Sequence, residues 1–135
     1  MQTKPVLTLE DVKKIALGAE AEATKNGWKV VIAICDDGGH PLFLQRLDGA
    51  APISAHIAPE KAKTAALGRR ESKIYEDMIN NGRYSFLRAP ELDGMLEGGV
   101  PIVVDGHTVG AVGVSGVKSA DDARIAKAGV AALGL

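Results

Sequence analysis

Cysteine and aromatic residues are scarce in this sequence. Aromatic side chains make up 4% of its 135 residues, and Cys35 is the single cysteine. One thiol cannot close a disulfide within the chain, and it cannot build a cysteine-rich zinc site. Because Cys35 lies inside an apolar run, we interpret it as a small buried hydrophobe and not as a nucleophile.

Long hydrophobic runs and an excess of one charge are also absent. Sixteen Lys and Arg against seventeen Asp and Glu give a formal net charge of −1, which does not supply the positive field that nucleic-acid binding requires. The longest apolar runs, such as residues 30–35, are far shorter than the roughly 20 residues that cross a bilayer. The N-terminus shows no apolar signal core. We therefore predict a cytoplasmic protein without a nucleic-acid or membrane partner.

Helical and strand patterns alternate along the chain. The predicted elements are a helix over 8–26, strands over 28–35 and 42–47, helical segments that begin at Ser54 or Ala58 and end at Asn80, strands over 100–104 and 107–115, and a last helix from Ser119. Thr8 is a suitable N-cap, and Ser119 with Asp122 has the capping-box spacing. Asp105-Gly106 favours a type I′ turn. Two hairpins among helices predict one α+β domain over residues 1–135, with helices packed on an antiparallel sheet.

Small residues dominate the predicted core. Gly110, Gly113 and Gly116 in the last predicted strand indicate either close packing of a helix or subunit, or room for a flat ligand. Small side chains bury little apolar area each, at about 25 cal/mol per Å². Association between subunits would add buried area, so we predict a homo-oligomer.

The three histidines lack the i, i+4 spacing of a helical metal site. His40 and His107 each follow a turn glycine, and we interpret both as exposed residues without a special role. His56 precedes Pro59 in a segment without charged side chains. This context makes His56 the candidate ligand for an iron or a substrate, and a packed or solvated histidine is the alternative.

A set of cations is expected to converge at one end of the sheet. A guanidinium binds a carboxylate through two parallel hydrogen bonds, and a lysine adds a point charge. The set consists of Arg46, Lys61, Arg69 and Arg70. Thr64, one turn beyond Lys61, would line the same helical face. Alternatively, Arg69 and Arg70 pair with surface carboxylates and Thr64 only packs.

The string Glu97-Gly98-Gly99 precedes a predicted strand. Paired glycines allow close approach of the backbone and expose amide donors, and Glu97 would act as a general base if it were desolvated. A simple turn is the alternative. We expect this segment and the second helix to meet at a shared cleft. No phosphate-loop or serine-hydrolase motif occurs.

Five ordered blocks carry a resemblance to a known family. They are DDGGH at 36–40, RLD at 46–48, EKAKTAA at 60–66, EGGVP at 97–101 and GAVGVSG at 110–116. Together they resemble the GlcG/HbpS family over about residues 7–133. PI at 52–53 and ALGRRE at 66–71 are most similar to its GlcG-like members. The resemblance implies a profilin-like fold, an antiparallel sheet of about five strands, and homo-oligomers from dimer to octamer.

The same resemblance implies two alternative functions. Members similar to HbpS and to the C-terminal domain of PduO bind haem, which implies a small-ligand binding protein for haem or another tetrapyrrole. The resemblance carries over no iron ligand, and the sequence context makes His56 the candidate metal ligand. GlcG-like members are associated with glycolate-utilisation operons and have no settled activity, and some relatives in aromatic-degradation gene clusters process small carboxylate intermediates.

The second alternative is therefore an enzyme acting on a small carboxylate. In this interpretation Arg46 or Arg70 holds the anion, and Glu97 or Lys61 moves a proton. Backbone amides of Gly98-Gly99 then stabilise the developing charge. A third alternative is an accessory scaffold whose glycine strips serve only assembly, which predicts an oligomer without a ligand-sized cavity.

Overall fold

A four-stranded antiparallel sheet forms the centre of the computed structural model, which describes residues 1–135. The strands are β1 (Val31–Asp36), β2 (Pro41–Arg46), β3 (Gly99–Val104) and β4 (His107–Ser115), in the spatial order β2-β1-β4-β3. The helices are α1 (Leu9–Lys25), α2 (Ser54–Gly68), α3 (Ser72–Asn80), the short 3₁₀ helix η1 (Tyr84–Arg88) and α4 (Ser119–Ala131). The α+β class is confirmed, whereas the sheet has four strands instead of the five that the resemblance implies.

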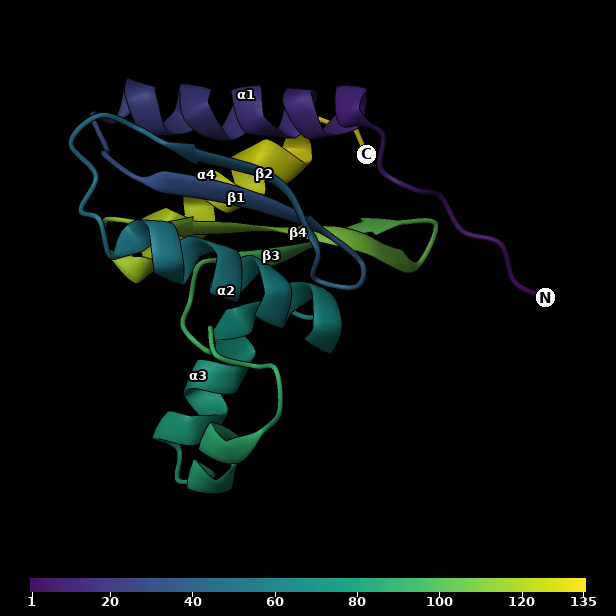
Figure 1. Cartoon of the computed structure of the whole chain (residues 1–135), viewed down its shortest axis with the longest axis vertical. Helices are drawn as coiled ribbons and strands as arrows, with labels where there is room; N and C mark the ends of the chain where they lie inside the picture. The colour runs from purple at the N-terminus through teal and green to yellow at the C-terminus, as the bar shows by residue number, and fades with distance from the viewer.

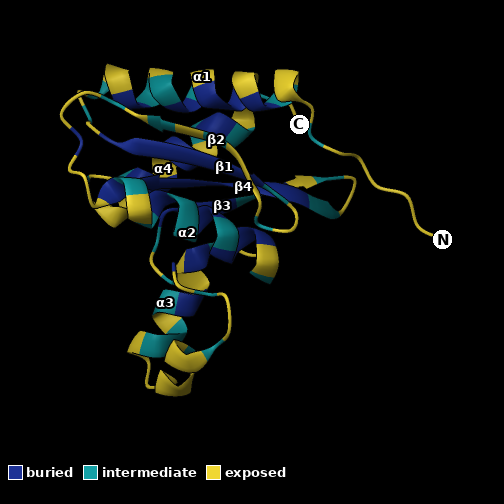
Figure 2. Cartoon of the chain, viewed as in Figure 1, coloured by how far each residue is buried: buried dark blue, intermediate teal, exposed yellow.

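The elements form three layers. Figure 1 shows α1 and α4 on one face of the sheet and α2 on the other, with α3 and η1 projecting away from the layers. Most of the projecting part is exposed, whereas the central strands are buried (Figure 2). None of the helices combines the length and apolar character that crossing a membrane requires.

Local signals explain most of the element ends. The Thr8 hydroxyl accepts a hydrogen bond from the Asp11 amide, and the Asp11 carboxylate accepts one from the Thr8 amide, which confirms the predicted cap of α1. In the β3–β4 turn, Asp105 and Gly106 have φ angles of 52° and 78°, as a type I′ turn requires. At α4 the predicted capping box is wrong. The N-cap there is Lys118, and no side chain caps the helix.

The two faces of the sheet differ in side-chain size. Large aliphatic residues pack between the sheet and the helices α1 and α4; among them are Ile15, Ile32, Ile34, Ile102, Val112, Val114 and Ile125. The face under α2 has small residues instead. Ala33 on β1 lies beside Gly113 on β4, which lies beside Gly99 on β3. A Cβ atom on Gly113 would lie 2.1 Å from the backbone oxygen of Ala58, so this glycine serves close packing of α2.

Candidate functional site

Lys61 lies in the interior and does not face a cleft. Its side chain is 4% exposed, and its ammonium donates hydrogen bonds to the Val114 oxygen at 3.0 Å and to Asp122 Oδ2 at 3.1 Å. The other carboxylate oxygen of Asp122 accepts from the Val117 amide at 3.1 Å. Burial raises the pKa of Asp122, and the Lys61 charge opposes this rise. The pair therefore ties α2 to the start of α4.

The paired glycines pack directly on this buried lysine. A Cβ on Gly98 would lie 2.8 Å from Lys61 Nζ, and a Cβ on Gly99 would lie 2.2 Å from the Lys61 backbone oxygen. The Gly99 amide donates to Ser72 Oγ at 2.8 Å. The second helix and the segment before β3 do meet, as expected. They meet as packed backbone, so the expected cleft is absent and the Gly99 amide is already used.

Thr64 and Glu97 flank the same packed region. Thr64 is buried, and its Oγ1 accepts a hydrogen bond from the Gly94 amide at 3.1 Å. The amide of Glu97 lies 3.4 Å from both carboxylate oxygens of Glu76. Thr64 thus holds the loop that crosses α2, which matches the packing alternative. The proton-transfer role of Glu97 stays a prediction.

The remaining predicted residues lie apart from Lys61. Arg46 and Arg70 each interact with residues close to them in the sequence. Arg46 donates through Nε and Nη2 to the Ala50 oxygen at 3.1 and 2.9 Å. The Arg70 guanidinium lies 5.4 Å from the centre of the Tyr75 ring. His56 is exposed in the first turn of α2. Their ligand-binding roles stay predictions, and the chain offers them no common cleft with Lys61.

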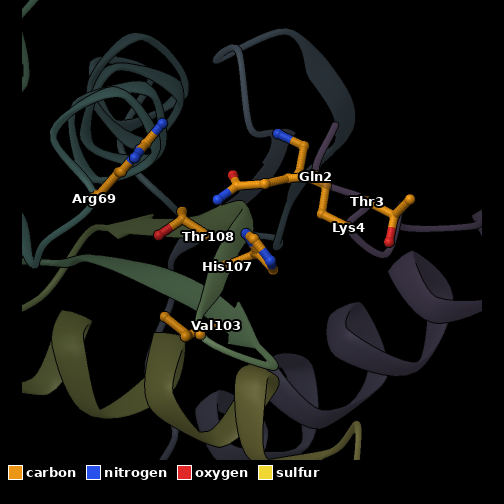
Figure 3. A pocket seen from close by; sticks show the side chains of 8 residues that line it. Gln2, Thr3, Lys4, Arg69, Val103, His107 and Thr108 are labelled. Atoms are coloured by element: carbon orange, nitrogen blue, oxygen red, sulfur yellow. The ribbon is translucent and has the colours of Figure 1, made fainter.

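A cavity of about 520 Å³ lies elsewhere, beside the β3–β4 hairpin. Its lining residues are Gln2, Thr3, Lys4, Arg69, Val103, Gly106, His107 and Thr108. In Figure 3 the His107 ring and Thr108 lie on the hairpin, Arg69 comes from the end of α2, and Gln2, Thr3 and Lys4 come from the N-terminal segment. Three distant parts of the chain therefore place an imidazole and two cations around one space.

Two features of this cavity were not evident from the sequence. Arg69 is the C-cap of α2 and has a left-handed φ of 54°, a position where glycine is usual. The Lys4 ammonium pairs with Asp37, which fixes the N-terminal segment against the β1–β2 turn and lowers the pKa of Asp37. Sequence analysis placed His107 just after a turn glycine, and only the fold brings this turn to Arg69.

His40 differs from the other histidines in its local pairing. Its Nδ1 lies 3.1 Å from both carboxylate oxygens of Asp36 within the β1–β2 turn. No group of three or more His, Cys, Asp or Glu side chains is placed to hold a metal ion.

Comparison with known proteins defines the class. The chain matches the family described as "Haem degrading protein HbpS-like" over residues 7–131. Two solved structures share its fold. A double mutant of HbpS from Streptomyces reticuli is 32% identical, with a TM-score of 0.90 over 100% of this chain and 92% of that chain. The PduOC:Heme complex is 27% identical, with a TM-score of 0.86 over 95% of each chain.

A curated relative supports the same assignment. Protein GlcG of Escherichia coli (strain K12) is 57% identical over 115 residues, which are 85% of each chain. The chain belongs to the HbpS-like family, as the five sequence blocks indicate. Its structural neighbours include a protein solved in complex with haem.

Proposed function

We propose that this protein binds a small anionic ligand in the cavity beside the β3–β4 hairpin, and that haem is the ligand. The observation that carries the proposal is that His107 and Arg69 line the same cavity. The family description and the PduOC:Heme neighbour support haem as the candidate. Ligand cavities in proteins commonly span about 300–1,000 Å³, a range that includes the 520 Å³ found here.

Two residues of the cavity match parts of haem, and Val103 is the one hydrophobic residue among the eight that line it. An imidazole nitrogen is a common axial ligand of haem iron, and His107 would supply it. A guanidinium binds carboxylates such as the haem propionates through two parallel hydrogen bonds, and Arg69 would do so here. Val103, which is 48% exposed, offers an apolar contact for the ring. Bound haem would supply a redox-active iron.

Titration with haemin tests this proposal. We expect a Soret band that saturates near one haem per chain and is lost in His107→Ala. Arg69→Ala should weaken binding by about tenfold to a hundredfold, because a charge-assisted hydrogen bond contributes roughly 1.5–3 kcal/mol. His40→Ala is the matched control and should bind as the unchanged protein does.

His56→Ala distinguishes the cavity from the site expected from sequence. If His56→Ala abolishes the Soret band and His107→Ala retains it, the haem binds at the start of α2 and the cavity assignment is wrong. If no variant changes the spectrum, histidine ligation is wrong. Circular dichroism of each variant verifies that the fold is intact.

A further inference from the structure

A second cavity lies between α2 and the edge of the sheet formed by β1 and β2. Its volume is about 180 Å³, and Ala33, Phe43, Leu44 and Pro59 are among its lining residues. Glu60 and Lys63 are the charged side chains that line it. Cys35 lines it too, and burial raises the pKa of this thiol to about 12, so it is neutral at pH 7. The space is therefore mostly apolar, with one carboxylate and one ammonium.

One carboxylate oxygen of Glu60 has no hydrogen-bond partner. Its Oε2 atom is shielded from solvent and has no partner in the chain. Buried polar atoms in folded proteins are nearly always hydrogen-bonded, and an unpaired charged group is costly. The backbone of Glu60 is fixed by the crossing loop, because a Cβ on Gly94 would lie 2.2 Å from the Glu60 carbonyl carbon. The structure thus fixes a carboxylate beside an apolar cavity with one of its oxygens unpaired.

The charges around this cavity favour a cation as the missing partner. Lys63 Nζ lies 2.6 Å from Glu91 Oε2. The hydrogen bond with Glu91 raises the pKa of Lys63, and the charges of Glu60 and Asp93 add to the rise. The single Lys63 ammonium therefore pairs with Glu91 and also lies in the electrostatic field of two more carboxylates, those of Glu60 and Asp93. Since no trio of metal-ligating side chains forms here and the walls are mostly apolar, an organic cation fits better than a metal ion.

We propose that this cavity binds a small primary ammonium compound with an apolar body. The ammonium group pairs with the Glu60 carboxylate, and the apolar body packs against Ala33, Leu44 and Pro59. This site is separate from the cavity of His107 and Arg69, and the proposal does not depend on haem binding.

Calorimetric titration with n-butylammonium and benzylammonium chloride tests the proposal, with 1-butanol and benzyl alcohol as neutral probes of the same shape. We expect one ammonium per chain and binding of the alcohols that is at least about tenfold weaker. Glu60→Gln should weaken ammonium binding by about tenfold or more. Glu10→Gln on α1, on the opposite face of the sheet, is the matched control and should not change it.

Leu44→Lys is a second test that does not alter Glu60. Leu44 is 51% exposed on the edge strand β2, where lysine is well tolerated. The new ammonium should compete for Glu60 and abolish binding without lowering the melting temperature. Equal affinity for amines and alcohols, or full binding by either Glu60→Gln or Leu44→Lys, overturns the proposal.

Discussion

At the scale of single residues, Lys61 forms a buried ion pair with Asp122, although its position in the sequence suggested a catalytic role. Replacing it in Lys61→Met leaves the Asp122 carboxylate buried without its 3.1 Å partner. Breaking a buried pair on one side costs about 3–5 kcal/mol. We expect a loss of this size in the free energy of unfolding, measured by urea denaturation.

Two further variants show whether the lost pair is the cause. Lys73→Met removes an exposed ammonium that pairs with Asp77 and should change stability little. The double variant Lys61→Met with Asp122→Leu should recover part of the loss, since no unpaired charge remains. If Lys61→Met is as stable as Lys73→Met, the buried pair does not stabilise the fold.

The ionisation of Asp122 should make stability depend on pH. Burial raises its pKa in the folded state above the ordinary value of 3.8, so between these two values the folded state holds a proton that the unfolded state has lost. The free energy of unfolding should therefore fall as pH rises from 3.8 through the raised pKa. Urea denaturation of the unchanged protein and of Asp122→Asn at several pH values measures this. The stability difference between them should decline with rising pH, and an increase would mean that pairing with Lys61 outweighs burial.

At the scale of elements, the contact between α2 and the sheet depends on glycine. Gly113→Ala would place a Cβ 2.1 Å from the Ala58 oxygen and 2.5 Å from the Ala62 amide. Because these are backbone atoms, no rotamer change relieves the overlap, and we expect a loss of about 3 kcal/mol in the free energy of unfolding. Gly27→Ala is the control. Gly27 has a φ of 69°, and no atom lies within 4 Å of the added Cβ. Only the unfavourable backbone conformation should therefore lower the free energy of unfolding, by about 1 kcal/mol. Equal losses in both variants would contradict close packing as the reason for Gly113.

The elements themselves could largely be predicted from local chemistry. Thr8 with Asp11 fixes the start of α1, and Asp105-Gly106 fixes the β3–β4 turn, because each signal acts within a few residues. Asp122 shows where this reasoning fails. Its spacing after Ser119 fits a capping box, but the distant Lys61 binds its carboxylate instead. One oxygen of this carboxylate accepts from the Val117 amide, the other binds an ammonium 61 positions away, and neither caps α4.

The candidate site belongs to the scale of the whole molecule, which explains why sequence analysis missed it. Lys61, Gly98 and Gly99 were expected to surround a ligand, and they do come together, but as packed interior. His107, Arg69 and the N-terminal segment have no relation in sequence, and only the folded sheet brings them to one cavity. The spacing of residues along the chain does not predict which distant segments will line the same cavity.

The projecting part of the molecule bears on the predicted homo-oligomer. Figure 2 shows α3 and η1 largely exposed, and their neighbourhood exposes large apolar side chains: Ile74, Tyr84, Leu87 and Leu96. Such concentrations are uncommon on monomers and typical of protein interfaces. We therefore expect chains to associate through this projection, and light scattering with size-exclusion chromatography should give a multiple of the 14.0 kDa chain mass.

Leu87→Arg locates that interface. Leu87 is 63% exposed, so arginine there should not disturb folding within one chain, whereas in an apolar interface it buries an unpaired charge and favours dissociation. The scattering mass should fall toward 14.0 kDa while circular dichroism stays unchanged. Leu17→Arg on the outer side of α1, where Leu17 is 65% exposed, is the matched control. Dissociation by Leu17→Arg alone would place the interface on α1, and a 14.0 kDa unchanged protein would show that the homo-oligomer prediction is wrong.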